Sequence, residues 1–417
     1  MHPDPHQRRR QRQEKRAKRE ALQRKLKIGG AAILALALVG LLVFLLLPKG
    51  GTPDAPSSTG TPSPVPSGSD APSAPTAENT VIHFAATGDL NITDKIIASG
   101  KEDFSDIFRD VAPLLSAADL TTVNLEGNIA GAPYGTASGS APHALVQALQ
   151  RCGVDMIQLA NSFSINRGPS GLSSTIDAVR SAGLEPVGAF KNEQEYASSR
   201  GFSLFEVKGI KIAVVGFTKG LGGMSLSDVS ENCVNLLYTD YDSTYQKINK
   251  KKINAIFDQI DLEQPDLVIA LVHWGSVFND NISSTQKSIV KLLQSRGADA
   301  IIGTHPHYVQ KMTFDEQTGQ FVAYSLGDFV SDADEAGTEY SVLLDLEITK
   351  NGETGETKIT NYSYVPLFTV ATEESVQVVR LTEAMQAYTD GHLHAVSEAV
   401  YDDMVYALKR IKARVKG

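Results

Sequence analysis

The sequence predicts an α/β domain of two packed sheets with helices on the outside, and two observations support this prediction. Between residues 80 and 300, strand-like runs alternate with helical patterns, which is typical of parallel sheets with crossover helices. After residue 307 the pattern changes to strand-like runs joined by the turn-forming segment KNGETG at 350–355, which is typical of antiparallel strands. One domain at 80–372 accounts for both patterns.

The chain of 417 residues has a net charge of −9, and this charge is distributed unevenly. Residues 1–27 hold eleven Lys or Arg and three Asp or Glu, a net charge of +8, so the rest of the chain carries −17. Residues 28–47 are apolar and uncharged, and as a helix they are long enough to cross the roughly 30 Å core of a bilayer. Because basic flanks stay inside, we expect a single-pass protein of the cell membrane with a cytoplasmic N-terminus and an extracellular C-terminal domain.

Residues 48–79 are rich in Pro, Ser, Gly, Thr and Ala, so we expect an extended linker that cannot form a core. The basic tail at 1–27 also fits a nucleic-acid-binding arm, but the apolar run that follows it favours a tail beside the membrane. The acidic remainder argues against a nucleic-acid-binding main domain, because phosphate contacts need clustered Lys and Arg. We therefore expect the membrane as a partner, and no nucleic acid.

Apolar runs and their breakpoints predict the elements of the domain in order. Strands are expected at 81–87, 120–123, 155–160, 211–217, 266–272, 321–325, 340–348 and 358–364. Helices are expected at 104–117, 142–151, 170–182, 241–262 and 283–296. Residues 373–417 are expected to form two amphipathic helices, broken near Asp390 and Gly391, that pack on or extend the domain.

The two cysteines, Cys152 and Cys233, exclude a disulfide scaffold. One bridge between them is an option in an extracellular domain. We favour two buried free thiols, because free Cys is among the most buried residue types.

Several predicted strands end on a His or a carboxylate. The stretch IIGTHPHYV ends on His305 and His307, which would point to one side of an extended backbone. Asp89, Glu126 and His273 follow three other strands in the same way. Taken alone, the His pair also fits a loop that happens to carry two His, since a motif needs its context. Open α/β sheets place sites at the carboxyl ends of their strands, so we expect a shared site.

Six short motifs, in order, resemble the CapA-type poly-γ-glutamate capsule biosynthesis family, whose domain is similar to calcineurin-like metallophosphoesterases. They are TGDL, VNLEG, LANSFSINRG, LVHWG, GTHPHYVQ and YSLGDFV, and the resemblance covers about residues 81–370. The resemblance implies a four-layer α/β/β/α sandwich of the metallophosphoesterase type, with a two-metal site at one edge of the sheets.

The resemblance also implies which side chains hold the metals. The five ligands would be Asp89, Glu126, His273, His305 and His307. Glu126 would bridge the two ions, while Asn124 and Asn161 would lie beside the ligands. Carboxylates and imidazoles suit divalent Mn, Fe or Zn. Two such ions clamp a phosphoryl-type group and lower the pKa of a bridging water.

The sequence departs from the family pattern at four positions, one of which is Asn166, where relatives usually carry an Asp. Relatives read ANNH where this chain has Ala160, Asn161, Ser162 and Phe163. Ser162 stands where an amide ligand is expected and Phe163 where a catalytic His is expected. A phenyl ring cannot donate a proton, and losing a general acid costs roughly 10²- to 10⁴-fold in rate. Asp328 replaces an Asn, and we hypothesise that its carboxylate partly makes up for the missing ligand.

Three functions are compatible with these residues. The first is a membrane-anchored protein that assists synthesis, export or anchoring of an anionic surface polymer of the poly-γ-glutamate type, with synthase or export subunits as partners. The second is a metal-dependent phosphoesterase or polymer hydrolase. The third is a catalytically inactive relative that binds the polymer or a partner. Ser162 and Phe163 favour the third over the second.

Overall fold

The computed structural model describes residues 78–416, except residues 102, 228–229, 333, 373–374 and 393–395. The predicted basic tail at 1–27, the predicted membrane span at 28–47 and nearly all of the predicted linker at 48–79 lie outside the described residues. Within the described part of the chain, no helix has both the length and the apolar character needed to cross a membrane.

The first of two mixed sheets has eight strands in the order β14-β13-β12-β1-β2-β3-β4, with β11 beside β1. Neighbours from β1 to β4 run parallel, whereas β12, β13 and β14 pair antiparallel. The strands are β1 (Thr80–Asn91), β2 (Leu120–Glu126), β3 (Met156–Gln158), β4 (Glu185–Val187), β11 (Asp328–Val330), β12 (Tyr340–Lys350), β13 (Thr357–Ala371) and β14 (Val376–Arg380).

The second sheet has six strands in the order β5-β6-β7-β8-β10-β9. Its four central strands are parallel, and its two edge strands are antiparallel to their neighbours. The strands are β5 (Ser203–Val207), β6 (Ile210–Thr218), β7 (Leu267–His273), β8 (Ala300–Thr304), β9 (Met312–Asp315) and β10 (Gln320–Ala323).

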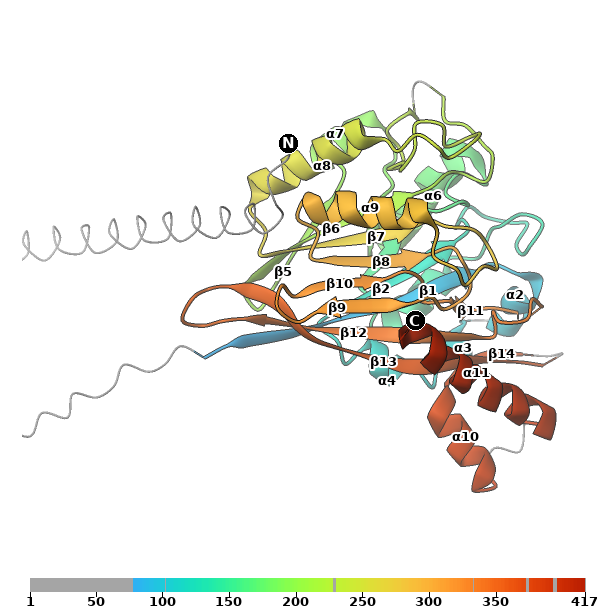
Figure 1. The fold of residues 1–417 in the computed structure, drawn as a ribbon. Coiled ribbons are helices and arrows are strands. Elements are labelled where there is room, and N and C mark those ends of the chain that lie inside the picture. The colour runs from blue at the N-terminus through green and yellow to red at the C-terminus, as the bar shows by residue number, and fades with distance from the viewer. Residues whose placement is uncertain are drawn as a thin grey trace, which may run out of the picture. The chain divides into compact units, whose positions relative to one another are not determined.

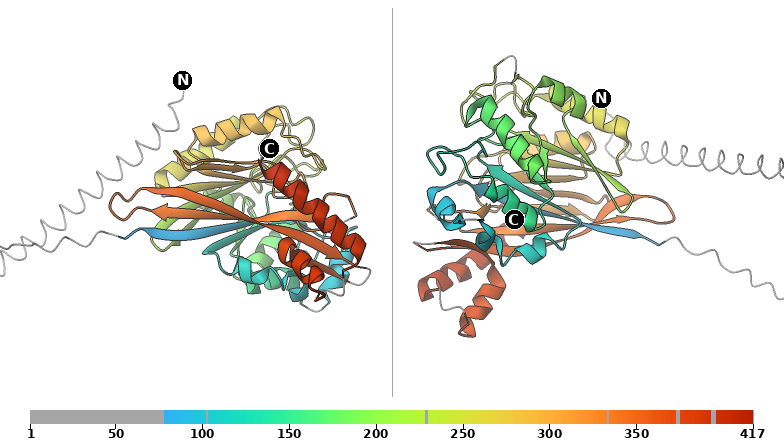
Figure 2. Two further views of the ribbon diagram at one scale, coloured as in Figure 1. Left: turned by 60° about the horizontal axis from the view of Figure 1, so that its bottom comes forward. Right: turned by 180° about the vertical axis from the view of Figure 1, so that it is seen from behind.

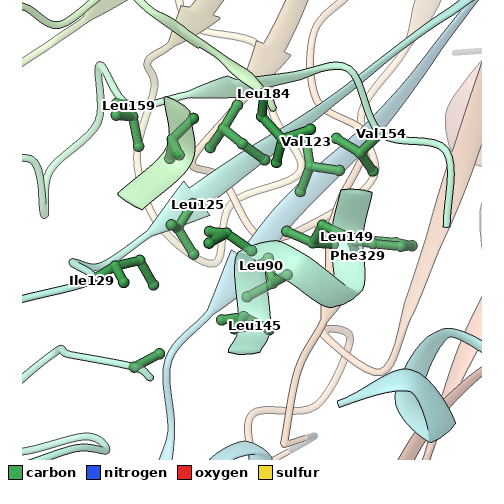
Figure 3. Packing of buried hydrophobic residues seen from close by; sticks show 14 of the residues in the cluster. Leu90, Val123, Leu125, Ile129, Leu145, Leu149, Val154, Leu159, Leu184 and Phe329 are labelled. Atoms are coloured by element: carbon green, nitrogen blue, oxygen red, sulfur yellow. The ribbon is translucent and has the colours of Figure 1, made fainter. Parts of the chain in front are cut away.

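The two sheets pack face to face with helices on their outer faces (Figure 1). Phe84 of β1 and Ile269 of β7 belong to one buried cluster between the sheets. On the outer face of the larger sheet, Leu145 and Leu149 of α5 lie over Val123 of β2 (Figure 3). The helices are α2 (Asp94–Gly100), α3 (Ser105–Phe108), α4 (Ala112–Leu115), α5 (Ala144–Arg151), α6 (Gly168–Ser181), α7 (Glu193–Ser199), α8 (Lys250–Glu263), α9 (Ser284–Ser295), α10 (Leu381–Thr389) and α11 (Glu398–Lys416).

Helices α8 and α9 cover the outer face of the six-stranded sheet, and α10 and α11 extend from the end of β14 (Figure 2). Buried side chains of α11, including Met404 and Ile411, join the cluster between the sheets. Cys152 and Cys233 are both buried and unpaired, as we expected.

Two predicted helices are wrong. The single helix at 104–117 is in fact α3 and α4, because Pro113 has no N–H to donate and fits only in the first turn of a new helix. The helix predicted at 241–262 begins only at Lys250, where the Asn249 side chain accepts the N–H of Lys252. In the chain before that cap, the Asp240 carboxylate accepts the backbone N–H groups of Gln246 and Lys247.

The C-terminal segment is also not purely helical. Residues 373–417 include β14, which pairs with β13 and extends the larger sheet. The alternating burial of Val376 and Val378 is the signal for this strand.

Candidate metal centre

The ends of four strands bring the predicted ligands together. Asp89 lies in β1, Glu126 ends β2 and His273 ends β7, while His305 follows directly after β8. The pairing register places Asp89 opposite Asn124 on one side and opposite Asp328 on the other. The larger sheet therefore supplies the carboxylates, and the smaller sheet supplies the imidazoles.

Glycines allow the strand ends to approach closely enough for these contacts. A Cβ at Gly88 would lie 1.7 Å from the carbonyl oxygen of Gly327, whose oxygen accepts the N–H of Asp89 at 3.0 Å. A Cβ at Gly303 would lie 2.1 Å from the Tyr324 carbonyl oxygen. Any side chain at either position would push the strands that carry the ligands apart.

Six acidic and imidazole side chains form two adjacent groups. Glu126, His273 and His305 each offer one ligand atom within 4.8 Å of the others. Asp89, His307 and Asp328 do the same. The groups adjoin, since His307 Nε2 lies 3.9 Å from Glu126 Oε2. Asp89, His273 and Glu126 are almost completely buried.

Two buried atoms in this cluster have no hydrogen-bond partner among the described residues. They are Glu126 Oε2 and His305 Nδ1. An unpaired buried acceptor is costly, and a bound divalent cation would satisfy both atoms. The donor set of carboxylate oxygens and imidazole nitrogens is also the one that such ions take, so these residues fit a metal centre.

Two amides orient the carboxylate of Asp89. Asn124 Nδ2 donates to Asp89 Oδ1 at 2.6 Å. Asn161 Nδ2 donates to Asn124 Oδ1 at 3.1 Å and to the Leu125 carbonyl at 2.7 Å. Asn161 Oδ1 accepts the N–H of Phe163 at 2.9 Å. The side chain of Asn161 is therefore fully engaged in holding Asn124, which in turn holds the carboxylate.

Thr218, at the end of β6, is a contact that the sequence reasoning missed. Its hydroxyl donates to the Gly220 carbonyl at 2.9 Å, so it accepts from His273 Nδ1, which lies 3.1 Å away. This bond leaves His273 Nε2, which lies 2.6 Å from Glu126 Oε1, as the nitrogen that a metal ion would take. The only signal in the sequence was a Thr that ends a buried strand.

Burial and charge set the protonation of the ligands. Burial lowers the pKa of His305 well below its usual value and also lowers that of His273, so both imidazoles are neutral and able to bind metal. Burial, reinforced by the charge of Glu126, raises the pKa of Asp89 well above its usual value. Burial alone would lower the pKa of His307, but Asp328, Glu126 and Asp89 together raise it to about 10.

The predicted extended geometry of the His pair is wrong. His305 has a φ of 92° and His307 a φ of 60°, both in the left-handed region. Their rings lie 5.9 Å apart at 53°, and each belongs to a different ligand group. The chain has to turn between the two groups, and the positive φ values make that turn.

Asp328 lies where we expected a compensating carboxylate. Its Oδ1 is 2.7 Å from His307 Nδ1, and burial raises its pKa to about 6. Ser162 is half-buried. Its neighbour Phe163 is 37% exposed and lines a cavity of about 320 Å³ that opens onto the cluster.

This cavity has an aromatic and acidic mouth. Glu126, His307 and Asp328 lie in its lining, together with the phenyl rings of Phe163 and Phe278. The acidic residues of the lining's outer segment are Asp332, Asp334 and Glu335. Phe278 and the acidic segment were not expected to belong to the site. A single exposed Phe five residues after His273 gave no periodic signal.

The fold and the cluster together define an α/β protein of two mixed sheets with a candidate metal centre at the strand ends. Residues 83–333 match the family described as bacterial capsule synthesis protein PGA_cap. Because the match covers more than half of the chain, the protein belongs to this family.

Two curated relatives are similar to this chain. The capsule biosynthesis protein CapA of Bacillus anthracis is 29% identical over 257 residues, which cover 59% of this chain and 58% of the relative. The PGA biosynthesis protein CapA of Bacillus subtilis (strain 168) is 24% identical over 297 residues, which cover 70% of this chain and 74% of the relative. The chain thus spans less than two thirds of the length of the first relative.

Two solved structures are similar at a lower level. The calcineurin-like phosphoesterase YfkN from Bacillus subtilis has a TM-score of 0.45 and 16% identity, covering 79% of this chain and 100% of that one. A putative 5′-nucleotidase from Staphylococcus aureus has a TM-score of 0.44 and 12% identity, covering 79% of this chain and 58% of that one. At these values the likeness carries no argument about function.

Proposed function

We propose that this protein is a CapA-like accessory protein that assists the synthesis, export or anchoring of an anionic surface polymer of the poly-γ-glutamate type. Its domain acts through a divalent metal centre in the cell envelope. The observation that carries the proposal is the buried cluster of Glu126, His273 and His305 beside Asp89 and His307, inside the segment that matches the capsule synthesis family.

The metal centre uses the two ligand groups described above. One ion would be held by Glu126, His273 and His305, and the other by Asp89, His307 and Asp328. When bound, two such ions attract an anionic group and lower the pKa of a water between them. The chain's own contribution is to hold the carboxylates and imidazoles in place and keep water away from the buried side of the cluster.

The remaining parts of the proposal concern location and partners. The apolar residues 28–47 anchor the chain in the cell membrane with the basic tail inside and the domain outside. Partners are the anionic polymer and the synthase or export subunits of its machinery. Because the chain after residue 27 has a net negative charge, the metal ions provide the local positive charge that binding of a polyanion needs.

Deleting the gene in the bacterium that encodes it tests this function. We expect the surface polymer, measured as glutamate released by acid hydrolysis of washed cells, to fall sharply and to return with the wild-type gene. Glu126→Gln should fail to restore the polymer, whereas Asp177→Asn, at an exposed position of helix α6, should restore it. Unchanged surface polymer in the deletion strain would overturn the proposal.

A second candidate function is a metal-dependent phosphoesterase. It is favoured by the unpaired Glu126 Oε2 and by the two adjacent ligand groups, and it is opposed by Phe163 at the cavity wall. Purified protein loaded with Mn²⁺ and assayed with bis(p-nitrophenyl) phosphate separates the candidates. Hydrolysis by the wild type that is lost in Glu126→Gln supports the phosphoesterase. Bound metal without turnover supports the accessory role, and absence of both supports an inactive binding protein.

A further inference from the structure

The C-terminal helix α11 binds the loop that carries Phe278, one of the residues that line the cavity. Arg410 and Arg414 both bind Asp280, at 3.1 and 3.0 Å. Asp280 belongs to the loop between β7 and α9, two residues beyond Phe278. Two guanidinium groups on one helix thus hold one carboxylate on a loop of the candidate site. We call Asp280, Arg410 and Arg414 the Asp280 clamp.

The loop held by this clamp contacts the His turn directly. The N–H of Phe278 donates to the Pro306 carbonyl at 2.9 Å, and the Phe278 ring lies 5.5 Å from the ring of His307. A second tie joins the same segments, since Gln310 Nε2 donates to the Asn279 carbonyl at 2.8 Å. Movement of the loop therefore disturbs the backbone that positions His305 and His307.

Arg414 also contacts the residue that follows His307. Its guanidinium lies 5.0 Å from the centre of the Tyr308 ring and 5.7 Å from that of Tyr340, and its side chain is only 11% exposed. The Tyr308 hydroxyl donates to the Ala336 carbonyl at 2.8 Å, next to Glu335 of the cavity lining. One side chain of α11 thus contacts both the loop with Phe278 and the segment with His307, and each of these segments supplies one residue of the cavity lining.

We propose that the Asp280 clamp positions the candidate site, so that α11 sets the geometry of His307 and of the Phe278 wall. The inference rests on the proposed metal centre. The clamp acts through other residues, because none of its members lines the cavity. Helix α11 lies beyond residues 83–333, the segment that matches the family. The two arginines of the clamp are therefore outside the family match.

Simple packing is the competing explanation for α11, because Met404, Ala407 and Ile411 bury one face of the helix regardless of the clamp. The two explanations differ at Asp280, which is on the loop and is 37% exposed. Asp280→Asn removes both ion pairs without changing the buried face of α11. Its matched control is Asp177→Asn on α6, which breaks the exposed ion pair between Asp177 and Lys191.

The test measures site geometry and loop order separately in the full-length protein. Trp274, the one tryptophan of the chain, is buried next to His273 and reports Co²⁺ binding through quenching of its fluorescence. We expect Asp280→Asn to weaken Co²⁺ binding about 10-fold and to change the visible absorption of the bound Co²⁺, as loss of an outer contact to a metal site does. Its thermal midpoint should stay close to that of Asp177→Asn.

Amide hydrogen exchange of the metal-free protein tests whether the Asp280 clamp orders these segments, independently of metal binding. We expect faster exchange at 276–282 and 305–310 in Asp280→Asn, with no change in the helix from 398 to 416. If both segments of Asp280→Asn exchange at the same rate as in the wild type, the proposed clamp is wrong. If the wild-type protein binds no Co²⁺, the metal centre of the proposed function is wrong, while the exchange result still supports or overturns the clamp.

Discussion

Phe163 is the single residue that most restricts the chemistry of the site. Its ring lines the cavity with Glu126, His307 and Asp328, where a proton donor would face a bound ligand. The backbone around it is already fixed, because its N–H is held by Asn161 Oδ1. A proton donor at this position would face the cavity, but the phenyl ring that is present cannot transfer a proton.

Phe163→His would place a proton donor at this position of the cavity wall. We expect metal-dependent hydrolysis of bis(p-nitrophenyl) phosphate to rise by roughly 10²-fold or more, since a positioned general acid contributes roughly 10²- to 10⁴-fold. Phe163→Ala is the control, because it opens the cavity without adding a proton donor. Equal rates for the two variants would show that the ring does not stand in a catalytic position.

Thr218 offers a second test at this scale. Thr218→Val removes the oxygen that accepts from His273 Nδ1 and leaves that imidazole free to rotate or change tautomer. We expect Co²⁺ affinity, followed by Trp274 fluorescence, to fall about 10- to 100-fold. Thr218→Ser keeps the hydroxyl and should bind Co²⁺ nearly as the wild type does. Weak binding by the serine variant would point to packing instead.

The sequence predicted which side chains gather at this edge of the sheets better than it predicted what surrounds them. Asp89, Glu126, His273 and His305 end apolar strands, and a strand end is visible in the sequence because the apolar run stops there. Thr218 and Phe278 act through contacts between residues far apart in the chain, and no local pattern records such contacts. The turn at His305 and His307 was predicted as extended, because Pro306 fixes only its own φ and restricts the residue before it.

At the scale of elements, the approach of β1 to the loop before β11 depends on Gly88. Gly88→Ala places a Cβ 1.7 Å from the Gly327 oxygen, so β1 and β11 have to separate. We expect the free energy of unfolding in urea to fall by about 1–3 kcal/mol or more. Co²⁺ affinity should fall as well, since Asp89 and Asp328 face each other across this contact.

Gly131→Ala is the contrasting variant. Its Cβ would meet nothing within 4 Å, although its φ of 81° favours Gly. It should cost only about 1 kcal/mol of strain and leave Co²⁺ binding unchanged. An equal loss of metal affinity in both variants would mean that general destabilisation, not strand spacing, weakens the site.

Helix α8 carries a buried amine that makes stability depend on pH. Burial lowers the pKa of Lys252 from 10.5 to about 8, although its Nζ donates to Asn232 Oδ1. Below pH 8 the folded protein bears the cost of a buried charge. Between pH 8 and 10.5 only the unfolded chain keeps that proton, so stability rises with pH.

Lys252→Met should remove this dependence. We expect the difference in unfolding free energy between variant and wild type to shift by about 1–3 kcal/mol between pH 7 and pH 10.5, with the wild type gaining. Urea titrations at the two pH values measure it, and other titrating groups cancel because both variants share them. A difference that does not change with pH would show that the amine keeps its ordinary pKa.

At the scale of the whole molecule, the chain consists of a described domain and an N-terminal part known from its sequence. The alternation of strands and helices predicted the α/β class, and the turn at 350–355 predicted the antiparallel β12–β13 pair, which the structure contains. Short strands such as β4 and β11, with three residues each, were missed because so few residues show no period.

The membrane anchor is the prediction that belongs to this scale. We expect the full chain to sediment with membranes and to dissolve in detergent but not in sodium carbonate, because residues 28–47 are apolar enough to span a bilayer. A chain that starts at residue 80 should stay in the supernatant. Release of the full chain by carbonate would rule out a spanning segment.

The pairing of Asp89 with Asp328 has a consequence for biosynthesis. These partners are separated by most of the domain, so a ribosome that has made only the first three hundred residues has produced no complete ion-binding cage. Contacts this remote form late and slowly during folding. If the proposed centre binds metal, cation uptake would be a final maturation step, and the bound ion would link the first and last thirds of the domain.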